Sequence, residues 1–194
     1  MKTKKSLITL ASLAIILLVG VGATLAFLVM KSGPVTNTFV PGNVEVTVQE
    51  SFAQGGTEKT DVCIKNIGTV DAYIRVAIIP TWEDDEGNPV GVSASLSDLD
   101  ITWTNNNNWQ QGADGFWYYT SPVPAGDSTE NLIASATVKT DSAGYNAGYK
   151  MNLQILAQGI QADGVDSNDE TPVELAWGSG VSGVNDDDSL NIKH

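Results

Sequence analysis

The sequence is poor in the residues on which most catalytic and metal sites depend. Its 194 residues include one cysteine, Cys63, and one histidine, His194, at the last position. A single cysteine excludes an intramolecular disulfide; we expect a buried thiol, with an exposed thiol for intermolecular pairing as the alternative. A single terminal histidine argues against zinc sites and catalytic triads built on histidine. We expect no enzymatic activity, and a carboxylate-based hydrolase ranks last because no Asp or Glu spacing singles out a pair.

Positive charge is also scarce. Ten Lys and Arg residues stand against 23 Asp and Glu, for a formal net charge of −13, and three of the lysines lie within the first five residues. An acidic chain of this kind repels the phosphates of nucleic acid and of anionic lipid, which excludes both as partners of the body. The only arginine, Arg75, lies in an apolar stretch, where we expect an ion pair with Asp71 or Glu45.

The N-terminal segment has the three parts of a secretory signal peptide. A lysine-rich start at 1–5 is followed by an apolar run at 7–19 and then by small residues. We predict a signal helix at residues 1–26, cut by a signal peptidase between Ala26 and Phe27, with cleavage after Ala23 as an alternative. The other interpretation is an uncleaved anchor, the protein's only contact with membrane, because the apolar run at 7–30 is long enough to span a bilayer. Either way we expect the body to be secreted, in an extracellular matrix or at the cell surface.

Period-two alternation and frequent turn signals indicate an all-β body. Val44, Val46 and Val48 share one face, as expected of a half-buried antiparallel strand. Further strands are predicted at 60–65, 72–80, 99–104, 116–120, 132–140 and 149–160. The strand at 72–80 is the most apolar, and we expect it to be central and buried on both faces for part of its length. No stretch beyond residue 30 shows a helical period, so we predict a jelly-roll-like antiparallel β-sandwich at residues 27–162.

The composition changes at Asp163. Residues 163–194 are rich in Asp, Asn, Ser and Gly, with one apolar patch at 173–177. We predict an acidic, poorly ordered tail from which Trp177 docks on the body.

Two stretches of the body contain candidate binding residues. Asp84, Asp85, Glu86 and Asn88 form an acidic turn whose oxygens could bind calcium, although no EF-hand pattern is present. A solvated turn is the alternative, and we expect no cofactor. Trp109 lies beside an asparagine run and is the tryptophan that we expect to be exposed, as a platform on which a sugar could stack; packing in the core is the alternative.

Several segments together resemble the TasA/camelysin family of secreted proteins. The resemblance is carried by residues 22–27, 37–39, 42–50, the N-x-G-x-x-x-A-Y-x-R-V pattern within 65–76, and the landmarks at 82, 117–119 and 124–126. It covers roughly residues 1–162, and the tail has no counterpart. It implies a jelly-roll sandwich, a leader cut by a SipW-like signal peptidase and, in some members, extracellular biofilm-matrix fibres in which the N-terminal segment of one subunit adds as a strand to the next. The protease activity attached to the camelysin name does not fit, because H-E-x-x-H is absent.

The segment at 27–40 suits such a role. Val35, Asn37, Phe39 and Val40 lie in a short β-prone stretch between two prolines. An added strand satisfies a row of backbone groups at once, and a head-to-tail contact of this kind yields filaments. We therefore expect a structural subunit whose partners are copies of itself, with related matrix proteins as further partners. The alternatives are that 35–40 pairs within its own sandwich and that the protein is a monomeric surface module for carbohydrate or protein.

Overall fold

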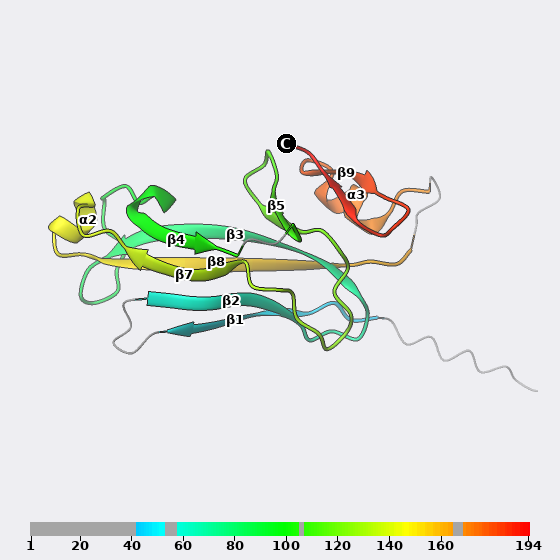
Figure 1. The fold of residues 1–194 in the computed structure, drawn as a ribbon, viewed down its shortest axis with the longest axis horizontal. Coiled ribbons are helices and arrows are strands. Elements are labelled where there is room, and N and C mark those ends of the chain that lie inside the picture. The colour runs from blue at the N-terminus through cyan, green and yellow to red at the C-terminus, as the bar shows by residue number, and fades with distance from the viewer. Residues whose placement is uncertain (1–41, 53–57, 105–106, 165–168) are drawn as a thin grey trace, which may run out of the picture. The chain divides into compact units, whose positions relative to one another are not determined.

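The computed structural model of the protein describes residues 42–52, 58–104, 107–164 and 169–194 (Figure 1). The predicted signal helix, its cleavage site and the predicted donor strand lie outside these ranges, and with them Ala26, Phe27, Val35, Asn37, Phe39 and Val40. Within the described ranges, no helix has both the length and the apolar character that crossing a bilayer requires.

Two four-stranded antiparallel sheets form a sandwich. The first sheet contains, in spatial order, β1 (Val46–Phe52), β2 (Glu58–Asn66), β7 (Ile133–Val138) and β4 (Leu99–Trp103). The second contains β5 (Trp109–Gln111), β6 (Trp117–Tyr119), β3 (Ala72–Glu83) and β8 (Lys150–Gln161). Successive strands from β2 to β5, and again from β6 to β8, alternate between the sheets, as in the winding of a jelly roll. The predicted all-β sandwich is confirmed.

The core lies between the two sheets and is built by the period-two alternation of their strands. Strands β2 and β3 each contribute two fully buried side chains to it: Val62, Ile64, Ile74 and Val76. Trp103 and Trp117 stack against this core with ring centroids 4.4 Å apart, which joins β4 of one sheet to β6 of the other. Burying an aliphatic side chain of this size contributes about 1.5–3 kcal/mol, so the alternation is the main source of the sandwich's stability.

A buried asparagine fixes the crossover from β2 to β3. Asn66 is fully buried, and its Nδ2 donates to the carbonyl oxygens of Val70 and Val123, both at 2.9 Å. Its Oδ1 accepts from the backbone N–H of Gly68 at 3.0 Å. The N-x-G pattern noted in the sequence is therefore structural: the amide side chain replaces the backbone partners that a tight crossover lacks.

The start of the described chain is tied to the same crossover. The N–H of Ile67 donates to the carbonyl of Glu45, and that of Thr69 to the carbonyl of Asn43, each at 2.8 Å. A Cβ at Gly68 would lie 2.3 Å from the Asn43 oxygen, so only glycine permits this approach. These bonds fix the position of Asn43 and Glu45 at the start of the described residues.

Residues 171–194, called the C-terminal cap below, cover part of the outer face of the second sheet. The cap consists of helix α3 (Pro172–Trp177) and a hairpin of β9 (Val181–Val184) and β10 (Leu190–Ile192) (Figure 1). A capping box between Thr171 and Glu174 begins the helix. Its buried residues pack with Tyr73 and Tyr118 of the sheet: Val173, Trp177, Val181, Leu190 and Ile192.

The prediction of a poorly ordered tail at 163–194 is wrong for the cap. Val173 and Trp177 are spaced four residues apart and therefore share one face of α3. Together with the apolar residues of the hairpin they form a second small core, which offsets the entropy of ordering a polar segment. The docking of Trp177 follows the prediction. The cap also explains why β3 is buried on both faces at Tyr73 and Ile74.

Two other helical turns are too short to show a period in the sequence. They are η1 (Leu96–Asp98) and α2 (Ala143–Asn146). In α2, a Cβ at Gly144 would lie 2.1 Å from Cδ2 of Trp82, so the glycine lets the turn close over the indole.

Candidate strand-docking site

The outer edge of β8 is the longest open sheet edge in the described structure. All 12 residues of β8 pair with β3, and no strand within the described residues pairs with its other edge. At about 3.4 Å per residue this edge is roughly 40 Å long. An unpaired edge presents a row of free backbone N–H and C=O groups to which another chain can add.

Pro80 identifies the backbone groups that point to this edge. It lies directly opposite Leu153, and opposite residues in an antiparallel pair exchange either two hydrogen bonds or none. Because proline has no N–H, the pair exchanges none, and the N–H and C=O of Leu153 point away from β3. By alternation, the same holds for Ile155 and Ala157. The side chains of these three residues pack in the core, so an added strand would lie beside the core itself.

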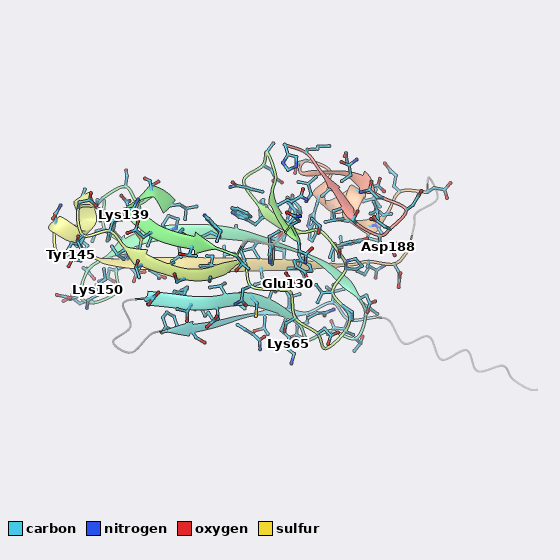
Figure 2. The ribbon with its side chains drawn as sticks, viewed as in Figure 1. Lys65, Glu130, Lys139, Tyr145, Lys150 and Asp188 are labelled. Carbon is cyan, nitrogen blue, oxygen red and sulfur yellow. The ribbon has the colours of Figure 1, made fainter. Side chains whose placement is uncertain are left out.

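A cavity of about 820 Å³ opens between the two sheets at one end of this edge. Its walls come from the last residues of β1, the first of β2, the last of β7 and the first of β8; they include Phe52, Lys59, Ala136, Val138, Met151 and Leu153. Figure 2 shows Tyr145 and Lys150, two further lining residues, at the end of the sandwich that carries α2. Phe52 and Tyr145 are 59% and 48% exposed at this cavity. The lining is mixed, with polar and charged side chains such as Glu58 and Glu83 beside the apolar ones. A hollow beside a free edge is suited to take alternate side chains of an added strand.

One cation lies inside this arrangement. Nζ of Lys59 lies 2.8 Å from Oε2 of Glu50 and donates to the carbonyl oxygen of Leu153 at 2.6 Å. The ammonium also lies 5.5 Å from the centroid of the Phe52 ring. Lys59 therefore reaches from β2, in the first sheet, to the backbone edge of β8, in the second. Its side chain is 13% exposed.

A β-bulge turns Lys59 toward the interior. Asp61 has a φ of 55°, and the β1–β2 register shifts between Gln49 and Ser51. An extra residue in one strand reverses the alternation beyond it. Lys59 consequently lies opposite Ala136, which is buried, whereas an unbroken alternation from the inward-facing Val62 would place it on the solvent face.

The described chain begins at the end of the sandwich opposite to the cavity. The register of β3 with β8 runs from Ala72–Gln161 at one end to Glu83–Lys150 at the other, and the cavity lies at the second end. At the first end, a Cβ at Gly159 would lie 2.8 Å from Cγ1 of Val46, where β1 starts. The start of the described chain and the cavity are therefore separated by most of the length of β8.

Trp109 is not the exposed platform that we expected. It is 6% exposed, its Nε1 donates to the carbonyl oxygen of Glu130 at 2.9 Å, and its ring meets that of Tyr119 edge to face at 5.1 Å. The neighbouring hollow is lined chiefly by the amides Asn107, Gln110 and Gln111. Because its indole packs in the sandwich, Trp109 offers no open ring face for a sugar.

The acidic turn of Asp84, Asp85, Glu86 and Asn88 is held by its own hydrogen bonds. Oδ1 of Asp84 accepts from the backbone N–H groups of Glu86 and Asn88, at 3.0 and 2.8 Å. These bonds, led by that from Asn88, lower the pKa of Asp84. Asp85 pairs with Lys150 at 2.9 Å. Within the described residues, no group of three His, Cys, Asp or Glu side chains is placed to hold a metal ion.

Arg75 forms its ion pair with a residue that the sequence did not suggest. Its guanidinium lies 3.9 Å from Asp114, where we expected Asp71 or Glu45. It also lies 4.1 Å from the centroid of the Phe116 ring and 4.8 Å from that of Trp177. Arg75 points to the outer face of the second sheet and is enclosed there by the C-terminal cap, so its role is structural.

Cys63 is neither fully buried nor fully exposed. It lies on β2 with Sγ 3.7 Å from Oε1 of Gln49 on β1. Burial, followed by the charge of Asp61, raises the pKa of the thiol, which keeps it protonated and unreactive at neutral pH.

A scan against protein-family models, a search of curated proteins and a search of solved structures each found no match. The TasA/camelysin resemblance therefore rests on the sequence segments alone. The structural feature that bears on function is the open edge of β8.

Proposed function

We propose that the protein is an exported structural subunit of extracellular biofilm-matrix fibres. Subunits assemble head to tail: residues 27–40 of one copy add as a strand to the free edge of β8 in the next. The observation that carries this proposal is an open 12-residue edge whose inward-facing side chains belong to the core, next to an inter-sheet cavity. The TasA/camelysin resemblance of the leader and of the segment behind it supports the same assignment.

Comparison of the four sheet edges favours β8 as the acceptor. Edge strand β5 has three residues, β4 has five and a register shift, and β1 has seven and a register shift. Short length and bulges are the usual devices that prevent an edge from pairing with another chain. Strand β8 is long and its register is unbroken. It is the one edge of the described sandwich that neither device blunts.

The described chain starts at one end of the sandwich and the cavity lies at the other, which favours a linear filament of subunits over a closed ring. A contact between two different surfaces of the same molecule is heterologous, and it propagates unless the rotation happens to close a ring. The N-terminal segment leaves beside the β2–β3 crossover, whereas the cavity lies at the far end of β8. A segment of 14 residues reaches about 45 Å when extended, which is enough to cover the acceptor edge of a neighbour. Removal of the leader would free this segment only outside the cell.

Hydrogen exchange at single amides of β8 tests the proposal. In a chain that begins at Phe27, we expect assembly into filaments and protection of the edge-facing amides of Leu153, Ile155 and Ala157. The amides of Gln154 and Leu156, in the same strand, point to β3 and serve as internal controls that are protected in monomer and filament alike.

A chain that begins at Gly42 is the matched control. It retains the whole described sandwich and should stay monomeric, with the three edge-facing amides exchanging fast. Filaments from this chain, or filaments in which the edge-facing amides remain unprotected, would contradict strand addition at β8. Protection of the same amides in dilute monomer of the longer chain would instead show that residues 35–40 pair within their own sandwich.

A further inference from the structure

An inward-pointing lysine at an open sheet edge calls for an explanation. The other lysine–carboxylate pairs, Lys139–Asp100 and Lys150–Asp85, lie on the surface with much more exposed side chains. Lys59 is 13% exposed and bonds a backbone carbonyl of the opposite sheet. Placing an ammonium there costs desolvation, which the Glu50 carboxylate and the Leu153 carbonyl oppose. A methionine of similar length would fill the same space without that cost.

We propose that Lys59 is a latch on the acceptor edge, which must be released before a strand can add to β8. This inference rests on the proposed function. The latch consists of the hydrogen bond from Lys59 Nζ to Leu153 O and of the Lys59–Glu50 ion pair that holds the ammonium in place.

The latch occupies a group that strand addition requires. The carbonyl of Leu153 points to the free edge and would accept an N–H from an added strand, but it already accepts from Lys59. A carbonyl oxygen can accept a second hydrogen bond, but the ammonium lies 2.6 Å from this one on the open side of β8, where the backbone of an added strand would lie, so the incoming chain displaces it. Glu50 is 26% exposed, so a displaced Lys59 can keep its carboxylate partner while it turns toward water. The displaced charge is not left unpaired, and release of the latch is reversible.

The latch restricts which strands are able to add. Inward-pointing charges are one of the devices that keep open edges from pairing indiscriminately. A strand that contributes only backbone bonds to β8 must first break a charge-assisted hydrogen bond. A strand whose side chains also fill the cavity regains that loss through apolar burial. Lys59 thus selects for an occupant with apolar side chains on one face, and in residues 35–40 of a second copy Val35 and Phe39, four positions apart, share a face of an extended strand.

Seeded elongation measures the latch directly. We compare Lys59→Met with Lys65→Met, both in the chain that begins at Phe27. Both residues lie on β2 and both substitutions remove one positive charge, but Lys65 does not line the cavity. With fragmented wild-type filaments as seeds, we expect Lys59→Met to elongate about tenfold faster than wild type, the effect of removing one charge-assisted hydrogen bond from the barrier. Lys65→Met should elongate at the wild-type rate.

The elongation rates of wild type and Lys59→Met distinguish a failure of the latch from a failure of fibre formation. If wild type elongates and Lys59→Met is equal to it or slower, the latch is overturned while fibre formation stands. If Lys59→Met forms filaments without seeds and wild type forms none, the latch is supported, and in wild type it prevents strand addition under the conditions used. No filaments from either chain would overturn the latch and the proposed function together. Circular dichroism checks the fold of each variant. Should Lys59→Met unfold, Glu50→Gln, which removes the anchor and keeps the lysine, must accelerate elongation for the inference to survive.

Discussion

The docking of the C-terminal cap can be tested with two substitutions on one short helix. Trp177 is 4% exposed, and its ring lies 6.0 Å from that of Tyr118 and 4.8 Å from the guanidinium carbon of Arg75. Leu175, two residues earlier in α3, is 57% exposed. Trp177→Ala removes the contact that joins the helix to the sheet, whereas Leu175→Ala removes a side chain that faces water.

The two substitutions should differ widely in cost. Truncating a buried tryptophan to alanine costs about 3–5 kcal/mol, including its aromatic and cation–π contacts. Truncating an exposed leucine stays within about 0.5 kcal/mol. The loss at Trp177 should fall first on the cap, because the cap has its own small core and meets the sandwich on the outer face around Tyr73 and Tyr118. We expect the cap to open locally while the sandwich stays folded.

Urea unfolding and hydrogen exchange distinguish these events. In Trp177→Ala, amides of β9 and β10 should exchange much faster than in wild type, while those of β3 and β8 that pair with each other keep their protection. Leu175→Ala should match wild type in both measurements. Equal exchange in the two variants would refute the packing of the cap on the second sheet. A single cooperative loss of both regions would refute its independence.

Two further predictions concern buried polar groups. Asn66→Ala should lower the free energy of unfolding by about 3 kcal/mol, because it leaves buried backbone groups without partners; the control Asn146→Ala, at an exposed asparagine, should change it little, and equal chemical-denaturation midpoints would contradict this assignment. Burial raises the pKa of Tyr73 and of Tyr118 from 10.0 to about 12, with Asp188 and Asp114 as their respective acidic neighbours. The folded state therefore holds these protons more tightly, and the stability they contribute is complete below pH 10 and is lost as the pH rises toward about 12. An absorbance titration of the five tyrosines should show two late ionisations that Tyr73→Phe and Tyr118→Phe each reduce by one, and a single ionisation step near pH 10 would contradict this.

The sequence predicts the sandwich well where a strand alternates on one face of a sheet. Alternation predicts the strands at 60–65 and 149–160 to within two residues of β2 and β8 at both ends, and it predicts the strand at 44–49, which ends three residues before β1 does. The cap was missed because composition averages over its residues: an acidic stretch with few apolar positions resembles a disordered one. The i,i+4 spacing of Val173 and Trp177 is a single pair, which is too little to establish a helical period in the sequence. Strand β5, with three residues, was too short to give any periodic signal.

Contacts between distant segments were the harder part to predict. Arg75 pairs with Asp114, 39 positions along the chain, because β3 and β6 are neighbours in the second sheet. Asp71 is a plausible partner in the sequence because it is close to Arg75 along the chain. The actual partner depends on the strand order, which the local sequence pattern does not reveal. The prediction that Trp109 is exposed was wrong for the same reason, because its ring contacts Tyr119 on the neighbouring strand of the sheet. Local alternation gives the face of a residue, but not the identity of its neighbours on that face.

At the acceptor edge of β8, one residue, Pro80, determines which backbone groups are free once the strand pairing is known. Pro80 in the most apolar strand already implies that one neighbour receives no N–H at that position. Given the pairing with Leu153, it fixes which face of the β8 backbone is open along the whole strand. The inward turn of Lys59 has no comparable signal, because the bulge at Asp61 lies in an ordinary polar stretch. From strict alternation, Lys59 would have been placed on the outer face with Cys63 and dismissed as solvated. The inward position of Lys59 thus depends on a single backbone irregularity, because the extra residue at Asp61 places Lys59 on the same face of β2 as Val62.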